Sequence, residues 1–160
     1  MHDVDVIVIG AGAAGMMCAA QAGKRGRDVI LIDHAKKIGE KIRISGGGRC
    51  NFTNLYAGPD AYLSQNPHFC KSALKQYTQY DFIELVKSYG IAFHEKKLGQ
   101  LFCDESAQQI IDMLLDECRD AGVRLEAETE VQEISKDGDK YKLISSQGEY
   151  RAQSIVIASG

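Results

Sequence analysis

The first 33 residues contain a glycine pattern that leaves few choices of fold. Residues 4–9 (VDVIVI) form a β-branched run, and the sequence GAGAAG follows it at residues 10–15. A short apolar run of this kind predicts a strand buried on both faces in a parallel sheet. A helix is predicted over 13–25, where Gly26 ends it, and a second buried strand (VILI) over 29–32. Because such a crossover is right-handed, the two strands are expected to lie parallel.

Each glycine of this G-x-G-x-x-G pattern has a physical role in binding a dinucleotide. Gly10 permits the tight turn out of the strand, Gly12 lets backbone N–H groups approach a pyrophosphate, and Gly15 lets the helix pack closely on the strand. The phosphates would lie at the helix N-terminus, whose first turn contains Ala13 and Ala14. This predicts a site for the ADP half of a dinucleotide.

An acidic residue in the expected place strengthens this prediction. Asp33 follows the second strand, where a carboxylate accepts hydrogen bonds from a ribose 2′-OH and repels a 2′-phosphate. His34, its neighbour, is predicted to touch the adenosine end. The alternative is a set of glycines that only shape a turn beside a solvated acid. The order of strand, glycines, helix, strand and acid favours the binding site.

The rest of the chain predicts one domain over residues 1–160. Residues 33–54 have no clean period and are predicted to be mainly an extended loop. Further helices are predicted over 69–77, 80–89 and 106–121, short antiparallel strands near 123–125, 130–134, 141–145 and 149–151, and a buried parallel strand over 154–158. The expected fold class is therefore α/β: a Rossmann-like FAD/NAD(P)-binding domain with a parallel sheet, flanking helices and a small antiparallel meander. Tyr77, Tyr80 and Tyr89 are expected to pack a helical surface, with a substrate wall as the alternative.

Composition narrows the partners and the compartment. The chain has 22 acidic residues against 19 Lys and Arg, a net charge of −3, so no nucleic-acid partner is expected. The uncharged stretch 6–20 is too short to span a bilayer and lacks the basic flank of a secretory signal, so no membrane association is expected. The five cysteines form no C-x-x-C pair and the four histidines have no metal-like spacing. Reduced thiols and a cytoplasmic location, without a bound metal, are the prediction.

The order of elements after the second strand resembles one class of flavoprotein. A nicotinamide dehydrogenase would continue with regular βα units, whereas this chain inserts a glycine-rich loop, helices and a meander. That order resembles the glutathione-reductase-like class with two dinucleotide-binding domains. Its closing strand typically ends in Ala-Thr-Gly, and Ala158, Ser159 and Gly160 stand there in this sequence. An early meander strand passes the adenine in that class, at the position of Glu130 and Val131.

The segment ISGGGRCNFTN, residues 44–54, resembles the hallmark of the BaiN-like (aminoacetone-oxidase-type) FAD-binding family, and the similarity runs over 4–160. The family's Gly-Arg-Lys and Gly-Arg-x-Phe-Pro marks are only partly matched, by GEK at 39–41 and GQLFC at 99–103. Consecutive glycines leave a backbone that can lie against a planar ring or a phosphate. The expected cofactor contacts here are Lys41, Gly46, Gly47, Gly48, Arg49, Cys50 and Asn51.

Alternatives exist at two of these positions. Arg49 could supply charge to the pyrophosphate or to the electron-rich edge of a reduced flavin, or it could lie in water on a surface loop. Cys50 has no resolving cysteine near it in the sequence, so a small packing role is favoured over a redox or nucleophilic one.

The resemblance implies an FAD-dependent oxidoreductase that uses NADH or NADPH to act on a small organic substrate. No general acid or base can be named from the sequence, and no oligomeric state is indicated. Relatives of this family are longer, so the rest of the FAD domain and a substrate domain are expected to be absent from these 160 residues. Two other functions are possible: a nicotinamide-binding sensor without catalysis, and a tRNA-modifying flavoprotein, against which the acidic balance counts.

Overall fold

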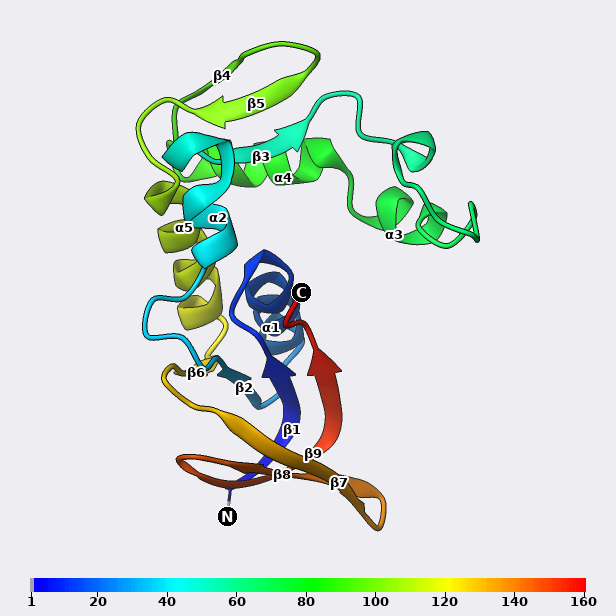
Figure 1. Cartoon of the computed structure of the whole chain (residues 1–160), viewed down its shortest axis with the longest axis vertical. Coiled ribbons are helices and arrows are strands. Elements are labelled where there is room, and N and C mark those ends of the chain that lie inside the picture. Colours follow the sequence, from blue (N-terminus) through cyan, green and yellow to red (C-terminus); the bar gives the residue numbers. More distant parts are fainter. Residues whose placement is uncertain (1) are drawn as a thin grey trace. The chain divides into compact units, whose positions relative to one another are not determined.

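The computed structural model describes residues 2–160, which divide into two compact units. Unit 1 combines the chain up to Lys41 with Leu114–Gly160, and unit 2 is Ile42–Met113. Figure 1 colours the chain along its sequence, so unit 1 includes both the blue and the red ends. Each unit is described by itself.

Unit 1 is built on a six-stranded sheet with the order β6-β2-β1-β9-β8-β7. Its strands are β1 (His2–Ile9), β2 (Val29–Ile32), β6 (Arg124–Glu126), β7 (Val131–Asp137), β8 (Lys140–Ser145) and β9 (Gly148–Ile157). Strands β6, β2, β1 and β9 are parallel, whereas β7, β8 and β9 form an antiparallel meander. The predicted α/β Rossmann-like class is confirmed.

Two details of the predicted strands are wrong. Residues 123–125 were expected in the meander, but β6 pairs in parallel with β2 at the opposite edge of the sheet, with Ile30 opposite Arg124. Strands near 149–151 and 154–158 are one continuous strand, β9, which pairs antiparallel with β8 and parallel with β1. Alternation within a single segment does not reveal its partners, because pairing is decided by the rest of the sheet.

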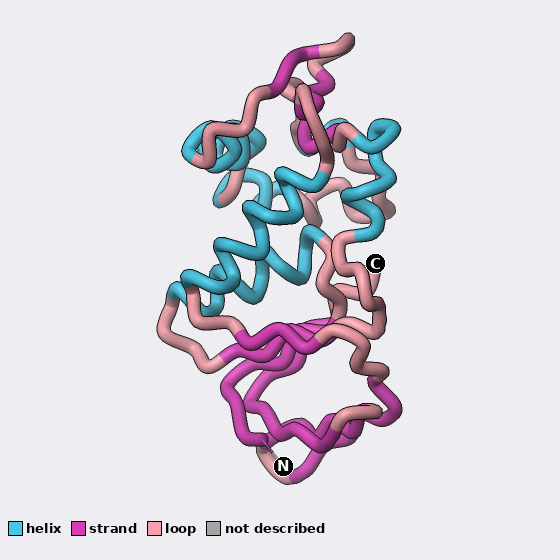
Figure 2. Tube along the Cα trace, turned by 90° about the vertical axis from the view of Figure 1, so that its left-hand side faces the viewer, coloured by secondary structure: helices cyan, strands magenta, loops and turns pink. Residues whose placement is uncertain are grey.

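The core of unit 1 joins the parallel strands to the meander. Ile7, Ile30 and Ile32 from the parallel strands cluster with Leu143 and Tyr150 from the meander. Figure 2, which draws the strands in magenta, shows that the sheet is strongly bent, and the cluster joins residues of β1, β2, β8 and β9. Burial of such side chains is worth about 1.5–3 kcal/mol each, which makes this cluster a main source of stability.

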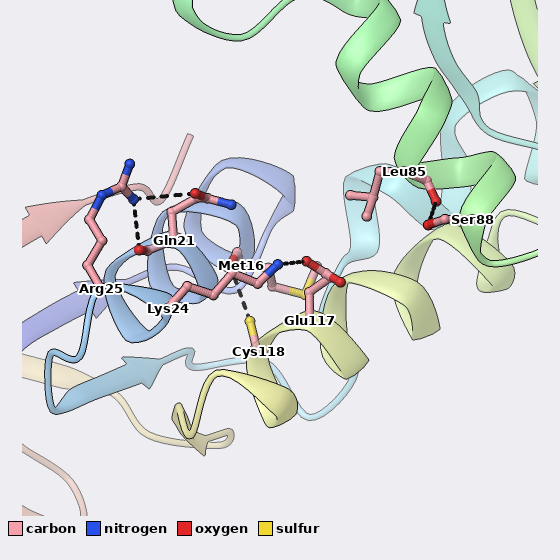
Figure 3. Close-up of polar contacts among 8 residues, drawn as sticks. All are labelled: Met16, Gln21, Lys24, Arg25, Leu85, Ser88, Glu117 and Cys118. Atoms are coloured by element: carbon pink, nitrogen blue, oxygen red, sulfur yellow. Dashed lines mark hydrogen bonds and ion pairs between the residues drawn. The ribbon is translucent and has the colours of Figure 1, made fainter.

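Helix α1 (Ala13–Lys24) packs on the second half of α5 (Gln108–Asp120) through contacts drawn in Figure 3. The Cys118 thiol donates a hydrogen bond to the carbonyl oxygen of Met16 at 3.2 Å, and Lys24 forms an ion pair with Glu117. Ala19 and Ala20, two small residues of α1, are fully buried. The helix ends at Lys24, one residue before the predicted boundary.

Unit 2 contains a three-stranded antiparallel sheet with the order β3-β5-β4. Its elements are α2 (Glu40–Ile44, shared with unit 1), η1 (Ser45–Gly48), β3 (Asn51–Asn54), η2 (Pro59–Ala61), α3 (Lys71–Gln76), α4 (Gln79–Ser88), β4 (Phe93–Glu95) and β5 (Gln100–Cys103). The helices predicted over 69–77 and 80–89 match α3 and α4. Thr78 begins α4 with a capping box, in which its side chain accepts from the Asp81 N–H.

The prediction that residues 33–54 are mainly loop is wrong in part, because α2, η1 and β3 lie within this range. Each of these elements has five residues or fewer, too short to show a period. Within residues 2–160 no helix is long and apolar enough to cross a membrane.

Candidate functional site

The turn between β1 and α1 is shaped by contacts that only glycine permits. Gly10 has a φ of +105°, and a Cβ atom there would lie 2.6 Å from the carbonyl oxygen of Ala158. A Cβ on Gly15 would lie 1.7 Å from the carbonyl oxygen of Gly10. Both distances are far below van der Waals contact, so these glycines bring β1, β9 and α1 together at one point (Figure 1).

The N-terminus of α1 is not covered by other residues, in contrast to the tightly packed turn that precedes it. Gly12 is the N-cap residue of α1, its side-chain position has no atom within 4 Å, and no acidic residue occupies the first turn. Ala13 and Ala14 follow it and are exposed. Their backbone N–H groups belong to the first turn, which has no intrahelical acceptors, and the helix dipole favours negative charge here. This arrangement can accept an anion.

Asp33 is fixed directly beside this turn. One carboxylate oxygen accepts from the Ala11 N–H at 2.6 Å, and the other accepts from the Ala35 N–H at 2.8 Å. The side chain is only 12% exposed, whereas neighbouring His34 is 85% exposed. An ionised carboxylate has about four acceptor positions, so two remain for a ligand. The structure thus brings Asp33 and the glycine turn together, as the sequence predicts.

A cleft of about 700 Å³ lies at this edge of the sheet. It is lined by Ile9, Gly10, Ile32, Asp33, His34, Lys36, Glu128, Thr129, Glu130, Val131, Ser146 and Ser159. Several of these residues were predicted for the site, but Lys36, Glu128, Thr129 and Ser146 were not. Their segments come into the cleft through backbone pairing: the Thr129 N–H donates to the Asp33 carbonyl at 2.9 Å, a long-range contact that no local pattern signals.

The closing segment 158–160 approaches the same turn. The Ala158 N–H donates to the Ile9 carbonyl at 2.8 Å, and Ser159 lines the cleft. Lys41 also approaches this segment, because a Cβ on Gly160 would lie 2.9 Å from the lysine Nζ. The structure therefore gathers Gly10, Asp33, His34, Val131 and Ser159 around one cleft. Lys41 brings a positive charge to the end of β9.

The glycine loop predicted for the flavin, Gly46–Gly48, lies in unit 2. Its φ angles are +58°, +67° and +89°, all in the region that favours glycine. A backbone hydrogen bond holds the end of the loop: the Gly48 carbonyl accepts from the Ala107 N–H at 2.7 Å. Arg49 is exposed, and its carbonyl accepts from the Cys103 N–H at 3.0 Å.

The two residues after Arg49 are engaged inside unit 2. Cys50 is only 4% exposed and has a φ of +52°, and burial raises the pKa of its thiol. With the nitrogen of its amide oriented to donate, Asn51 reaches the carbonyl oxygens of Thr53 and Leu101 at 3.1 and 3.2 Å. A buried thiol with a raised pKa is a poor nucleophile, so the geometry favours packing for Cys50.

The geometry fits the ADP half of a dinucleotide. A pyrophosphate fits the open N-terminus at Gly12, where nothing occupies the side-chain position, and a ribose fits the remaining acceptor positions of Asp33. Within the part of the chain that the structure describes, no group of three or more His, Cys, Asp or Glu side chains is placed to hold a metal ion.

Comparison with known proteins identifies relatives along the whole chain. The family described as "HI0933-like protein Rossmann domain" matches residues 4–160. Two curated proteins named ribosomal RNA dihydrouridine synthase are similar: that of Escherichia coli is 59% identical over 160 residues, and that of Haemophilus influenzae is 49% identical over 158. A 3-dehydro-bile acid delta(4,6)-reductase of Clostridium scindens is 26% identical over 156 residues. These alignments cover 96–100% of this chain and 38–40% of the relatives, so the chain spans about two fifths of their length.

Solved structures share the fold at low sequence identity. A 3-ketosteroid-Δ4-(5α)-dehydrogenase from Rhodococcus jostii superposes with a TM-score of 0.70 at 18% identity, over 99% of this chain and 46% of that protein. A glycine oxidase from Geobacillus kaustophilus gives a TM-score of 0.63, also at 18% identity, over 100% of this chain and 56% of its own. Both likenesses support the fold alone.

The prediction that nucleic acid is not a partner is wrong. Relatives that are 59% and 49% identical bear the name of an enzyme that acts on ribosomal RNA. The prediction rested on the net charge of −3, which is a sum over the chain and does not describe any local surface. It also rested on a stretch that spans about two fifths of the relatives' length.

Proposed function

This chain belongs to the HI0933-like (BaiN) family of FAD-dependent Rossmann domains, and from that premise we propose that it forms the cofactor-binding part of a flavin-dependent reductase that converts uridine to dihydrouridine in ribosomal RNA. The RNA substrate is proposed because the chain is 59% identical over all 160 residues to the E. coli ribosomal RNA dihydrouridine synthase. The cofactor site is proposed because the Asp33 carboxylate accepts a hydrogen bond from the glycine turn.

The chemistry asked of such an enzyme is the saturation of one carbon–carbon double bond. Dihydrouridine differs from uridine by a hydride and a proton added across C5=C6, a bond conjugated to the C4 carbonyl. The bile-acid relative is also named a reductase, of a 4,6-unsaturated ring system bearing a 3-keto group. A flavin supplies the hydride for such reductions when it is bound. Reduction of a double bond conjugated to a carbonyl is therefore the reaction class that these relatives have in common.

Different residues at the cleft are proposed to bind different parts of the cofactor. We assign the pyrophosphate to the N–H groups that follow Gly12, in the first turn of α1 at Ala13 and Ala14. Asp33 holds the ribose, and Val131 marks the strand that passes the adenine.

The charges in the cleft select the form of the nucleotide. Glu128 and Glu130 line it together with Asp33, a group of carboxylates that disfavours any phosphate on the ribose. An unphosphorylated ADP half, as in FAD, fits this lining better than the 2′-phosphorylated ADP half of NADP.

Cofactor contacts beyond the ADP half are assigned from sequence resemblance. We propose Lys41, Ser159 and Gly160 for the middle of the cofactor. The loop Gly46–Gly48 with Arg49, Cys50 and Asn51 is proposed for the flavin half. NADH or NADPH is the proposed reductant, and a ribosomal RNA substrate implies a cytoplasmic enzyme.

The substrate is tested in cells. Ribosomal RNA from a strain that lacks the gene is digested to nucleosides, and dihydrouridine is measured by mass spectrometry beside the parent strain and a complemented strain. We expect dihydrouridine to be lost on deletion and restored by the wild-type gene, but not by a gene encoding Asp33→Asn together with Gly12→Val. Unchanged dihydrouridine in the deletion strain would refute the RNA substrate.

A second candidate is reduction of a small unsaturated ketone, favoured by the 26% identity to the bile-acid reductase. It is separated from the first by offering the purified, flavin-loaded protein either ribosomal RNA or a steroid enone and following NAD(P)H oxidation. A third candidate function is a nicotinamide-binding sensor without catalysis. A protein that takes up NADH but no FAD would support the sensor and refute both reductases.

A further inference from the structure

The segment 56–80, here called the aromatic arm, differs from the rest of the described chain in having no buried residue. It leaves β3, passes through α3 and returns to α4 in unit 2 (Figure 1). Every large aromatic side chain that is exposed among residues 2–160 lies in it: Tyr56, Tyr62, Phe69, Tyr77 and Tyr80. Tyr77 and Tyr80, which the sequence places in a group packing a helical surface, are 40% and 58% exposed. Exposed apolar side chains gathered in one segment mark an interaction site.

The charge of the aromatic arm is opposite to that of the chain as a whole. It contains Lys71 and Lys75 against one acidic residue, Asp60, in a chain with a net charge of −3. The two lysines are four residues apart at the ends of one helical turn of α3, so they share a face. Both are exposed, and neither has an acidic residue within the helix.

More positive charge lies next to the start of the aromatic arm. The Leu55 N–H donates to the Gly99 carbonyl at 2.8 Å, and a Cβ on Gly99 would lie 2.7 Å from the Tyr56 ring. Tyr56 therefore lies against the turn between β4 and β5, which carries the exposed Lys96 and Lys97. The segment that carries the exposed aromatic side chains therefore contains two exposed lysines and adjoins a turn with two more.

We propose that the aromatic arm binds a single-stranded stretch of the RNA substrate, a proposal that rests on the proposed function. Exposed tyrosines stack unpaired bases regardless of sequence, and lysines neutralise the phosphates between them. The positive charge of the arm within an acidic chain complements a polyanion, and its exposed rings favour unpaired bases over an acidic protein surface, whose carboxylates offer no planar face for stacking. Leu63 is its one exposed large aliphatic side chain, too few for insertion into a lipid bilayer.

The proposal is tested by RNA affinity of the protein as expressed from its own gene. The probes are deproteinised ribosomal RNA and a fluorescent oligouridine, measured by fluorescence anisotropy. Replacing Tyr62, Phe69 and Tyr77 together by alanine should weaken binding at least about tenfold, because the bases no longer have rings to stack on. Tyr62→Phe with Tyr77→Phe keeps the rings and should bind like the wild type.

The lysines are tested by salt dependence. Lys71→Gln with Lys75→Gln should lower the slope of log affinity against log salt by about 0.7 for each phosphate that a lysine no longer neutralises. The alanine variants should weaken binding without changing this slope. Ile134→Ala and Lys136→Gln, on β7 of unit 1, are the matched controls and should leave both quantities unchanged.

Flavin content, and reduction of the flavin by NAD(P)H, should be the same in all variants. If the wild type neither binds nor modifies RNA, the proposed function fails. If the wild type binds and modifies RNA but the triple alanine variant binds it equally well, the aromatic arm proposal is overturned while the function stands. Binding of the arm to lipid vesicles or to a protein, with RNA affinity unchanged by the substitutions, also overturns it.

Discussion

The two glycine-rich turns of this chain look alike in sequence but are held in different ways. In unit 1, Gly10 and Gly15 are surrounded, so that a side chain at either position would overlap a backbone carbonyl. In unit 2, Gly47 and Gly48 have no atom within 4 Å of a side-chain position, and only their φ angles of +67° and +89° call for glycine. The first turn is closed by packing at Gly10 and Gly15. The second is packed only at Gly46, where a Cβ would lie 2.6 Å from the Phe102 ring, and is open at Gly47 and Gly48.

The difference in packing between the two turns suits them to different kinds of contact with a ligand. Packing fixes the unit 1 turn against β9, which suits a site that must present N–H groups at fixed positions to a pyrophosphate. An open glycine pair instead leaves its backbone bare on one side. Substitutions that add a single methyl group can separate these two cases, and the following predictions run from the largest effect to the smallest.

The largest effect is expected for Gly15→Ala. The added Cβ would lie 1.7 Å from the Gly10 carbonyl oxygen, so helix and strand must move apart. We expect a loss of more than about 3 kcal/mol of the free energy of unfolding, and loss of FAD from the purified protein. Chemical denaturation and flavin absorption measure the two effects.

Gly12→Ala is the matched control in the same turn. Its Cβ meets nothing within 4 Å and its φ of −84° suits any residue, so the cost should be limited to the poorer N-cap preference of alanine, about 0.5–1 kcal/mol. FAD affinity should still fall, because the methyl group enters the space assigned to the phosphates. Equal destabilisation by both substitutions would contradict the contrast between closed and open positions.

The next effect is alkaline destabilisation through one buried thiol in each unit. Burial raises the pKa of Cys103 in unit 2 and of Cys118 in unit 1 from 9.0 to about 11. The folded protein retains protons that the unfolded chain releases, so stability is complete below about pH 9 and is lost as the pH rises toward 11. The loss should reach about 2–3 kcal/mol per thiol.

Denaturation curves measured from about pH 8 to about pH 11 follow this loss, because that range contains the ordinary pKa of a thiol and reaches the raised value of both cysteines. Cys118→Ala and Cys103→Ala should each reduce the pH slope, and together they should reduce it further; the remainder comes from groups such as Cys50 and Tyr150, whose pKa values burial also raises. A slope that neither substitution changes would show that other groups govern the alkaline limit.

Asp33→Asn should have a moderate effect confined to unit 1. The amide keeps one oxygen for the Ala11 or the Ala35 N–H but cannot accept from both, and it loses the charge that binds a ribose hydroxyl. We expect a cost of about 1–2 kcal/mol in stability and FAD binding weakened by about tenfold. Isothermal titration with FAD measures the affinity. Asp139→Asn, at an exposed residue in the turn between β7 and β8, is the control and should change neither quantity appreciably.

The smallest effect is expected for Gly47→Ala in unit 2. The methyl group meets no atom, so the cost is only that of a left-handed backbone conformation, about 1 kcal/mol. Asn tolerates this conformation better than alanine, so Gly47→Asn should recover part of the loss. A loss as large as that of Gly15→Ala would show that the loop is packed as tightly as the unit 1 turn.

The sequence predicts unit 1 better than unit 2, for physical reasons. The first strand, α1, β2 and Asp33 follow from local patterns, since each has a period, a cap or a flanking glycine. The pairing of β6 with β2 and the continuity of β9 depend on contacts between distant segments. Strands β4 and β5 were not predicted, because residues 93–103 (FHEKKLGQLFC) contain a polar, lysine-rich turn without strand alternation at their centre.

The candidate site follows the same division. Gly10, Gly12, Gly15 and Asp33 could be placed together from spacing alone. Thr129 and Ser146 reach the cleft only through sheet pairing, so no motif marks them. The proposed RNA substrate could not be predicted from net charge, because net charge is a sum over the chain in which the lysines of the aromatic arm are outweighed by acids elsewhere.

Strand β9 has a consequence for how the protein is made. It pairs with β1 from His2 opposite Tyr150 to Ile9 opposite Ile157, so the two partners are synthesised nearly a whole chain apart. During synthesis, one edge of β1 stays unpaired until residue 157 has been translated. Until then this edge is exposed to chaperones or to aggregation. Since the Ala158 N–H donates to the Ile9 carbonyl, the proposed cofactor site is expected to form only after translation of this stretch.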